Sequence, residues 1–263
     1  MTAALFLVDA LPPAEQFASA GTAPAGDLAA TGPDGGQFTL GGPEGHHAAT
    51  VQRVRPGEVV LLSDGRGGLA TAVVRSVSRG RVELRIEQIR VEPAPAPRMV
   101  VAQGIAKGER GELAVQAMTE VGVDAIVPWA ASRSVAQWRG ERGERSWQRW
   151  QATAREAAKQ ARRAWLPEVT EPESTNRLSA RIANSGGAFV LHEEASDRLS
   201  SVVLPDAAEL VLVVGPEGGI TPEELAVFTA AGARPVRLGP GVLRTSTAGV
   251  AALALLSARL GRW

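Results

Sequence analysis

The stretch Val213-Val-Gly-Pro-Glu-Gly-Gly-Ile-Thr-Pro-Glu-Glu-Leu225 leads from an apolar run through a glycine-rich turn into a helix. The start of that helix is marked by Thr221 as N-cap, Pro222 at the first position and Glu224 at the third, which together form a capping box. In open parallel α/β sheets, ligands bind in loops of this kind, beyond the carboxyl ends of the strands. The stretch therefore predicts an α/β fold with a ligand-binding loop at residues 215–220.

The chemistry of this loop does not suit a phosphate. A phosphate loop presents backbone N–H groups and a helix N-terminus to negative charge, and Glu217 at its centre would repel the ligand. The loop is neither a Gly-x-Gly-x-x-Gly nor a Walker motif, so NAD and ATP fit poorly. A Gly-x-Ser-x-Gly nucleophile elbow is absent, and the three histidines offer no i, i+4 pair for a metal. The expected ligand is a small organic molecule without a phosphate.

Two other loops are expected at the same edge of the sheet. Leu191-His-Glu-Glu-Ala195 follows one predicted strand, and Gly239-Pro-Gly-Val-Leu-Arg244 follows another. The glycines of either Gly-Pro loop could serve only to permit a tight strand-to-helix turn. Two Gly-Pro loops at successive strand ends favour a shared ligand site instead.

Strands and helices alternate through the C-terminal two thirds of the chain, which predicts a largely parallel sheet covered by helices. Hydrophobic periodicity places strands at 99–103, 124–128, 188–192, 210–214 and 235–238, and helices at 112–121, 146–165 and 247–260. The second helix is expected to begin with Ser146 as N-cap and to carry a tryptophan seam, which we interpret as core or dimer interface.

The segment Val91-Glu-Pro-Ala-Pro-Ala-Pro-Arg98 predicts a domain boundary, because its alternating prolines suit neither a helix nor a central strand. We therefore expect an N-terminal domain over residues 1–92 and a C-terminal domain over 98–263. Upstream, strands are predicted at 58–62, 69–74 and 82–86, typical of a small β-barrel or sandwich. Residues 21–45, rich in Gly, Ala and Pro, are expected to form an irregular loop.

Charge is unevenly distributed in a chain whose formal net charge is zero. From Pro128 to Leu166 there are nine basic residues against three acids, and the whole chain has 26 Arg and two Lys. A local excess of this kind can attract RNA or DNA phosphates, or it can be a solvated arginine-rich surface. Charge alone leaves both interpretations open.

The composition also limits the cellular setting. The chain has no cysteine, which excludes disulfides and thiolate metal sites and favours a reducing compartment. No apolar run approaches the roughly 20 residues of a membrane span, and the N-terminus lacks the basic start of a signal peptide. We expect a soluble, cytoplasmic protein with no membrane contact and no metal.

Two motifs carry a resemblance to a known family. Residues 212–225 and residues 238–248, Leu-Gly-Pro-Gly-Val-Leu-Arg-Thr-Ser-Thr-Ala, closely resemble the bacterial RsmE family. Further matches, among them Lys107-Gly-Glu, Glu120-Val-Gly-Val123 and Val51-Gln-Arg53, extend the resemblance over nearly the whole chain. Members of this family are SPOUT methyltransferases, which use S-adenosylmethionine (SAM) to methylate N3 of a uridine in 16S ribosomal RNA of the small ribosomal subunit.

The resemblance implies a specific architecture and cofactor site. The C-terminal SPOUT domain is expected to contain a deep trefoil knot, the N-terminal domain to be a PUA-like β-barrel that binds RNA, and the protein to be a homodimer. The residues implied in SAM binding are Leu191, Gly215, Glu217, Gly219, Ile220, Leu238, Gly239, Val242 and Leu243. A carboxylate at 217 suits this ligand, because SAM carries a sulfonium and an α-ammonium and no phosphate.

Basic residues are the candidates for handling the RNA. Arg133 and Arg244 are expected to hold the uracil or its phosphate during catalysis, although either could pair with loop carbonyls or acids instead. The residues expected to contact RNA elsewhere are Arg53, Lys107, Arg110, Arg155, Lys159, Arg162 and Arg163. Three of these, at 155, 159 and 162, are predicted to share one stripe of the long helix.

The sequence departs from the family pattern at three places. Ser246 replaces a common glutamate, Ser132 replaces a common acid, and an apolar Ala3–Asp9 segment replaces a basic start. Two alternatives to a 16S rRNA methyltransferase therefore stay open: an RNA-binding ribosome assembly factor that has lost catalysis, and a SPOUT methyltransferase that acts on another RNA.

Overall fold

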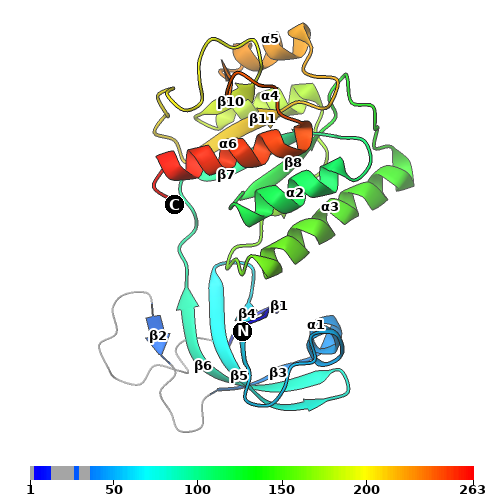
Figure 1. Ribbon diagram of the computed structural model, residues 1–263, viewed down its shortest axis with the longest axis vertical. Helices are drawn as coiled ribbons and strands as arrows, with labels where there is room; N and C mark the ends of the chain where they lie inside the picture. Colours follow the sequence, from blue (N-terminus) through cyan, green and yellow to red (C-terminus); the bar gives the residue numbers. More distant parts are fainter. Residues whose placement is uncertain (1–2, 13–26, 30–35) are drawn as a thin grey trace. The chain divides into compact units, whose positions relative to one another are not determined.

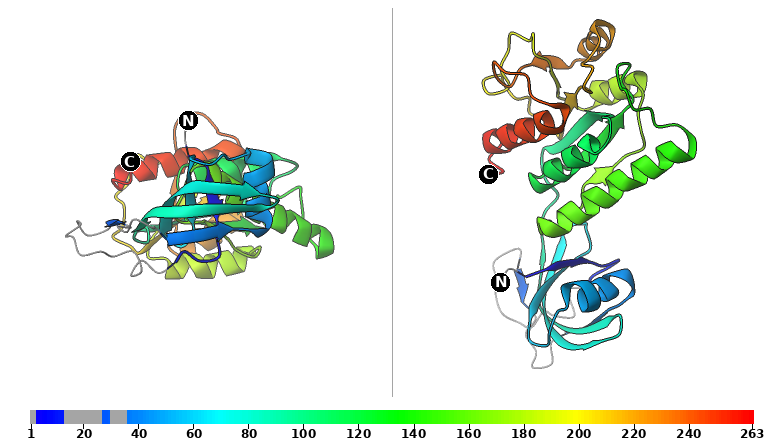
Figure 2. Two further views of the ribbon diagram at one scale, coloured as in Figure 1. Left: turned by 90° about the horizontal axis from the view of Figure 1, so that it is seen from below. Right: turned by 45° about the vertical axis from the view of Figure 1, so that its right-hand side comes forward.

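The computed structural model describes residues 3–12, 27–29 and 36–263, and the chain forms two compact units. The smaller unit comprises residues 1–94 together with 158–166, and the larger unit comprises residues 95–157 and 167–263. Both are drawn in Figures 1 and 2. The segment 158–166, at the end of a long helix, is thus far in sequence from the rest of its unit.

The smaller unit is a bent, mainly antiparallel sheet. Its elements are β1 (Leu5–Leu7), β2 (Asp27–Ala29), β3 (Gly36–Leu40), α1 (Gly42–His46), the π-helix η2 (His47–Gln52), β4 (Val59–Ser63), β5 (Gly68–Ser78) and β6 (Arg81–Val91). The strand order is β1-β4-β5-β6-β2, with β3 also on β6, and only β1 and β4 run parallel. Bulges in β5 bend the long strands around a core that includes Phe6, Leu62, Leu84 and Ile86.

The expectation of an irregular loop over residues 21–45 is wrong where the structure describes this segment. Residues 21–26 and 30–35 lie outside the described residues, whereas β2, β3 and the start of α1 lie within them. Glycine here serves close packing as well as turning: a Cβ on Gly45 would stand 2.5 Å from the carbonyl oxygen of Leu40 and 2.6 Å from that of Gly80. Composition alone cannot distinguish these two uses of glycine.

The larger unit is a parallel sheet with helices on both faces, as predicted. Its strands are β7 (Arg98–Gly104), β8 (Ala125–Trp129), β9 (Glu168–Val169), β10 (Ala188–Leu191), β11 (Glu209–Val214) and β12 (Arg234–Val236), in the order β12-β10-β11-β7-β8-β9. Every neighbouring pair is parallel. Its helices are α2 (Arg110–Glu120), α3 (Gly140–Gln160), α4 (Thr175–Asn184), α5 (Pro222–Ala230) and α6 (Thr245–Arg259).

Each face of this sheet has its own core. On one face, α2, α3 and α6 pack with residues such as Met118, Trp150 and Leu253, and on the other face α4 and α5 pack with Leu178 and Phe228 (Figure 1). Among the described residues, no helix combines the length and the apolar composition that crossing a bilayer requires.

The long helix α3 is displaced from its predicted range. It begins at Gly140 and not at Ser146, whose hydroxyl lies inside the helix and donates to the Arg142 carbonyl at 3.0 Å. It ends at Gln160, because Arg162 adopts a left-handed backbone conformation with φ of 54°. Trp165 then lies outside the helix, and its Nε1 donates to the Glu92 carbonyl at 3.0 Å. The expected N-cap and the expected helical stripe through residue 162 are therefore both wrong.

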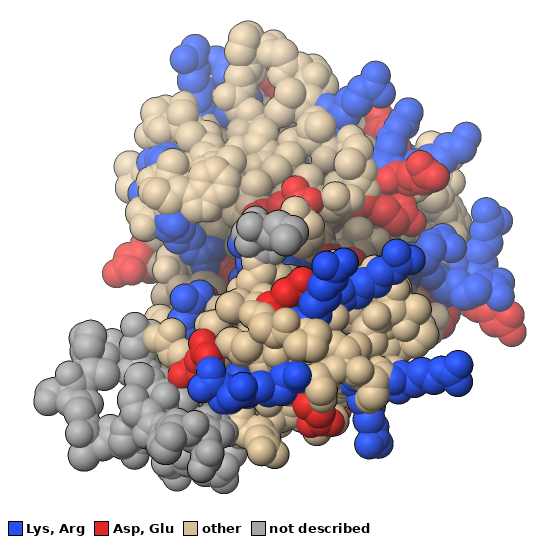
Figure 3. Space-filling model, turned by 60° about the horizontal axis from the view of Figure 1, so that its bottom comes forward, with Lys and Arg blue, Asp and Glu red and all other residues tan. Residues whose placement is uncertain are grey.

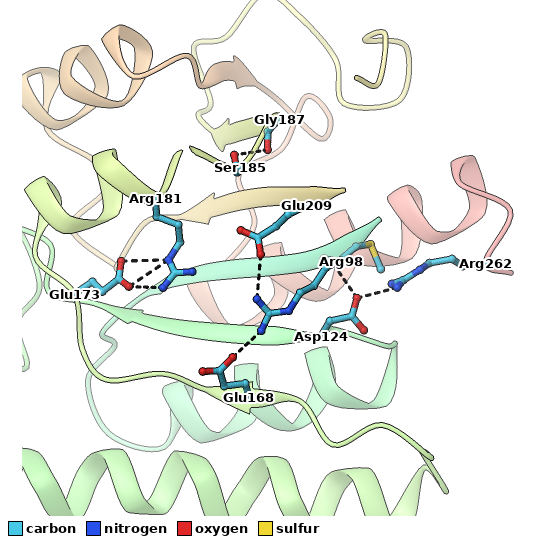
Figure 4. A network of polar contacts seen from close by, with 10 residues as sticks. Arg98, Asp124, Glu168, Glu173, Arg181, Ser185, Gly187, Glu209 and Arg262 are labelled. Carbon is cyan, nitrogen blue, oxygen red and sulfur yellow. Dashed lines mark hydrogen bonds and ion pairs between the residues drawn. The ribbon is translucent and has the colours of Figure 1, made fainter. Parts of the chain in front are cut away.

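A network of ion pairs closes the edge of the sheet where the strands begin (Figure 4). Arg98, the first residue of β7, donates to Glu168 of β9 at 2.6 Å and to Glu209 of β11 at 3.0 Å. Nearby, Asp124 Oδ2 accepts from the Met99 N–H and from Arg262 Nη2, both at 2.8 Å. These bonds tie the final residues of the chain to the loop that precedes β8.

We expect Asp124→Ala to lower the free energy of unfolding by about 3 kcal/mol, because removing one partner of a buried pair leaves the other charge uncompensated. The Asp124 and Arg262 side chains are 7% and 17% exposed. Asp197→Ala is the matched control: its pair with Arg234 is 43% and 50% exposed, and its loss should cost at most about 1 kcal/mol. Urea denaturation measures both. If both variants lost the same unfolding free energy, burial of the ion pair would not be the reason for the effect of Asp124.

Candidate functional site

A cavity of about 490 Å³ lies at the carboxyl ends of β10, β11 and β12. In the sheet order, β10 lies between β11 and β12, so the loops that follow these three strands meet at one edge. The cavity is lined by all nine residues expected to hold the cofactor: Leu191, Gly215, Glu217, Gly219, Ile220, Leu238, Gly239, Val242 and Leu243. Arg110, Arg133 and Arg244 line it as well. The structure thus gathers these residues at one place, and their role in binding stays a prediction.

The Gly-Pro-Glu-Gly-Gly loop is a tight turn with no room for larger residues. The Gly219 N–H donates to the Pro216 carbonyl at 2.9 Å, and Gly219 has a φ of 75°, which disfavours any residue with a Cβ. A Cβ on Gly218 would stand 2.8 Å from both the Cβ and the carbonyl oxygen of Arg133. Glycine is therefore required by close approach at position 218 and by backbone conformation at position 219.

Glu217 points into a cluster of donors and is not a free charge in this loop. Its Oε1 accepts from the Lys107 N–H and from Arg110 Nη1, both at 3.1 Å, and its side chain is 22% exposed. Partial burial disfavours the ionised form, but hydrogen bonds from its own N–H, from Arg110 and from Lys107 outweigh that effect and lower the pKa of the Glu217 carboxyl. Glu217 therefore stays ionised and connects the β11–α5 loop to the β7–α2 loop.

We expect Glu217→Gln to separate charge from hydrogen bonding, because the amide oxygen can still accept from both donors. The folded protein should be less stable than wild type at neutral pH. The difference should shrink as the pH falls below 4.5 and disappear below the lowered pKa of the folded state. The sign follows from the lowered pKa: the carboxylate stabilises the folded state above its unfolded pKa and ceases to do so below its folded pKa. Thermal unfolding from pH 3 to 7 measures this. A constant difference over that range would contradict it.

Two side chains that sequence analysis did not single out connect the two Gly-Pro loops. Gln103, at the end of β7, is fully buried, and its Nε2 donates to the Thr245 hydroxyl at 2.9 Å. The Thr245 hydroxyl in turn donates to the Gly215 carbonyl at 2.8 Å. This chain ties the end of β11 to the first residue of α6. A buried glutamine within an apolar strand was the available signal, since buried polar groups need partners.

The predicted capping box at the start of α5 is confirmed. Thr221 Oγ1 accepts from the Glu224 N–H at 3.2 Å, and Glu224 Oε2 accepts from the Thr221 N–H at 3.0 Å. Glu224 does more than the sequence predicted, however, because its Oε1 also accepts from the Ser132 N–H at 2.7 Å. Ser132 lies in the β8–α3 loop, directly before Arg133.

The two arginines expected to hold the substrate differ in their surroundings. Arg133 Nη1 donates to the Gly218 carbonyl at 3.3 Å, so part of its donor capacity is used within the protein. Arg244 is the N-cap residue of α6, and its carbonyl accepts from the Thr247 N–H and hydroxyl. Within the described residues, no hydrogen bond or ion pair is recorded for the Arg244 guanidinium. Arg244 is therefore the better placed of the two for a ligand.

The substitution Ser246 leaves α6 without an acid in its first turn. Ser246 is 5% exposed, so a glutamate there would face the interior and not the solvent. No acid fills its place at the start of α6, and Thr247 is the residue whose hydroxyl contacts the N-cap carbonyl.

The other candidate RNA-binding residues differ in their exposure to solvent. Arg53, Lys107, Arg110, Arg155 and Arg162 are exposed, and Arg163 is half-buried. Lys159 does not fit the expected role, because it is 7% exposed and its Nζ pairs with Glu44 Oε1 at 3.2 Å inside the smaller unit. On the face in Figure 3, Lys and Arg side chains project at several places with Asp and Glu among them. Arg162 and Arg163 also lie beyond α3, so these residues do not form one helical stripe.

The histidines and acids do not assemble into a metal centre over the described part of the chain. His192 and Glu193 line the cavity, and His192 Nδ1 accepts from the Glu194 N–H at 3.3 Å. The chemistry available at this site is that of carboxylates, guanidinium groups, one imidazole, backbone amides and aliphatic side chains.

Family models match both parts of the chain. Residues 92–257 match the model described as an RNA methyltransferase domain, and residues 40–87 match the one described as an RNA methyltransferase PUA domain. The second match confirms the predicted PUA-like character of the N-terminal unit.

Individual proteins give the same result. The ribosomal RNA small subunit methyltransferase E of Mycobacterium tuberculosis is 44% identical over 88% of this chain and 90% of its own, and that of Bacillus subtilis is 32% identical over 84% and 89%. A Neisseria gonorrhoeae enzyme of that name, solved bound to S-adenosyl methionine, aligns over 98% of both chains with a TM-score of 0.80 and 25% identity. A putative methyltransferase from Legionella pneumophila, solved with SAM, aligns over 86% of this chain and 93% of its own with a TM-score of 0.76 and 30% identity. The chain belongs to the ribosomal RNA small subunit methyltransferase E family.

Proposed function

We propose that this protein transfers a methyl group from SAM to N3 of a uridine in the 16S RNA of the small ribosomal subunit. The observation that carries the proposal is the cavity formed by the two Gly-Pro loops and the loop after β10, in a chain of this family. Relatives named for methylation of small-subunit ribosomal RNA, and a related structure solved with SAM, support the substrate and the cofactor.

The residues around the cavity suit SAM. Its volume lies within the range of about 300–1,000 Å³ that is usual for cofactor sites. Aliphatic side chains such as Leu191, Ile220 and Leu238 offer an apolar surface for an adenosine, and the carboxylate of Glu193 suits a positively charged group. The site has no Gly-Lys-Ser/Thr cradle for a phosphate, in keeping with a nucleoside ligand that carries none.

The protein's part in the reaction is to orient two reactants and to stabilise charge. SAM, when bound, supplies a methyl group that is already activated by its sulfonium, so no metal is required. N3 must lose its proton to a base or to water before it can attack the methyl group, and this deprotonation places negative charge on N3 and the uracil oxygens. The charge is neutralised when the N3–methyl bond forms and the sulfur departs as a neutral thioether. We infer that Arg244 and Arg133 stabilise that charge or hold the neighbouring phosphate, because both line the cavity and carry permanent positive charge.

The remaining parts of the proposal follow from family membership. We propose that the PUA-like unit binds RNA, with exposed residues such as Arg53 contributing phosphate contacts. A deep trefoil knot in the larger unit, a homodimer and a cytoplasmic location are part of the same proposal. The domains assigned to these roles are residues 1–92 and 98–263.

The decisive experiment is transfer of labelled methyl from SAM to small ribosomal subunits isolated from a strain that lacks this gene. We expect label in 16S RNA, recovered as N3-methyluridine after digestion to nucleosides. Label that appears only with another RNA would contradict the substrate while leaving the methyltransferase proposal intact. SAM binding without transfer to any RNA would indicate an assembly factor, and absence of binding at millimolar SAM would contradict both.

A further inference from the structure

The carboxylate of Glu224 connects three segments that are distant in the sequence. Its Oε2 accepts from the Thr221 N–H at 3.0 Å, as a capping box requires. Its Oε1 accepts from the Ser132 N–H at 2.7 Å and from the Thr175 hydroxyl at 3.3 Å. The side chain thereby joins the β11–α5 loop, the β8–α3 loop and the first residue of α4, at a point where Glu224 is 3% exposed.

The surroundings of Glu224 are suited to a negative charge. It occupies the third position of α5 and contacts Thr175 at the start of α4, so the positive ends of two helix dipoles lie beside it. Both of its oxygens accept hydrogen bonds from backbone N–H groups. A glutamine has a single acceptor oxygen, and its NH₂ would face one of those N–H groups donor to donor. The change Glu224→Gln therefore removes a hydrogen bond as well as a charge.

The segment held by Glu224 leads directly to the cavity. Ser132, whose N–H it binds, precedes Arg133, and Arg133 lines the cavity. On its other side Arg133 packs closely on Gly218, whose absent Cβ would stand 2.8 Å from the Arg133 Cβ, and its Nη1 donates to the Gly218 carbonyl at 3.3 Å. The place of Arg133 is thus determined by Gly218 on one side and, through the Ser132 N–H, by Glu224 on the other.

We propose that Glu224 is a positioning residue for methyl transfer, which fixes Arg133 in the cavity by holding the Ser132 N–H. The inference rests on the proposed function of this cavity and adds a residue that itself has no access to the substrate. It predicts that the loss of Glu224 acts on catalysis through Arg133 and not through general destabilisation.

A double-mutant cycle tests this. Methyl transfer to small subunits that lack the modification is measured for wild type, Glu224→Gln, Arg133→Ala and the double variant. Glu224→Gln should lower kcat/KM for the RNA by about 10- to 100-fold, the value of a hydrogen bond to a charged group. In the Arg133→Ala background the same change should have less than about a threefold further effect. If the fall in kcat/KM of the double variant equals the product of the falls in the two single variants, the proposal is overturned.

The matched control is Glu223→Gln, the same chemical change one residue away. Glu223 is exposed, and its attraction to Arg133 is screened by solvent. The glutamine oxygen can keep its hydrogen bond with Thr221, so this variant should stay within about twofold of wild type. If Glu224→Gln does not fold, Thr175→Val removes one hydrogen bond to Glu224 and leaves the Ser132 N–H bound, although Trp129 Nε1 also loses an acceptor. Thr175→Val should lower kcat/KM by less than is expected for Glu224→Gln, and it should have no further effect in the Arg133→Ala background. If Thr175→Val lowers kcat/KM equally with and without Arg133, that result opposes the proposal.

Hydrogen exchange provides a measurement that does not depend on activity. In Glu224→Ala, which leaves the Ser132 N–H without any side-chain acceptor, the peptide that contains Ser132 and Arg133 should exchange at least about tenfold faster. Unchanged exchange there would contradict the positioning role even if methyl transfer fell. Failure of wild type to methylate RNA would instead contradict the proposed function, so the two failures are distinguishable.

Discussion

Gly104→Ala should weaken SAM binding by roughly 100-fold, the scale expected when a binding group is displaced by about 1 Å. Gly104 ends β7 against the Gly-Pro-Glu-Gly-Gly loop. A Cβ there would stand 2.5 Å from the Pro216 nitrogen, 2.8 Å from its Cδ and 2.9 Å from the Gly215 carbonyl carbon. Because two of these atoms belong to the backbone, the loop itself must move, and Gly215 and Glu217 move with it. Calorimetric titration with SAM measures the effect.

The control for this substitution is Gly41→Ala. Gly41 has a φ of −119°, which any residue adopts, and no atom lies within 4 Å of its absent Cβ. SAM affinity should therefore equal that of wild type. Overpacking at Gly104 should also lower the free energy of unfolding by about 1–3 kcal/mol. A Gly104→Ala protein with wild-type affinity and stability would show that β7 and the loop do not pack as described.

Thr245→Val should cost about 2–4 kcal/mol of unfolding free energy and weaken SAM binding. Valine has the same shape as threonine but leaves the Gly215 carbonyl without its donor and takes an acceptor from the buried Gln103 amide. Thr245 is 7% exposed, so water cannot readily replace these partners. The end of β11 and the start of α6 would separate, and both border the cavity.

Thr245→Ser distinguishes the hydroxyl from the methyl group. Serine keeps both hydrogen bonds and loses one buried methyl, worth about 0.8 kcal/mol. Urea denaturation and SAM titration of the two variants should therefore place serine close to wild type and valine far from it. Similar losses in both would mean that packing of the methyl group, and not the hydrogen-bonded chain, holds the two loops together.

The parts of this protein that sequence analysis predicted well depend on local rules. The capping box at Thr221 and Glu224 needs residues within one helical turn, and the strands of the parallel sheet are short apolar runs. Both were found close to their predicted positions. The cavity-lining residues were predicted from the resemblance together with the rule that such loops meet at the carboxyl ends of strands.

The predictions that were wrong concern residues whose structure depends on a partner distant in the sequence. Residues 36–40 form a strand because β6 supplies its pairing, and no feature of their own composition shows this. Lys159 looked like a surface cation on a helix, but it is buried because Glu44, 115 residues earlier, pairs with it. Trp165 continues the helical spacing of the tryptophans in the sequence, but it lies beyond α3 and donates to the carbonyl of Glu92, 73 residues earlier.

By itself, the sequence determined most of the strands and helices of the larger unit, but not β9 and α4, together with the start of α5 and the presence of two glycine-rich loops at successive strand ends. These follow from periodicity, capping and backbone freedom, which act over a few residues. Only the tertiary structure decided which contacts the glycines and the buried polar residues make. Gln103 finds its partner 142 residues away and Glu224 finds Ser132 at a separation of 92 residues, and hydrogen bonds of such reach exist only once the sheet has brought its loops together.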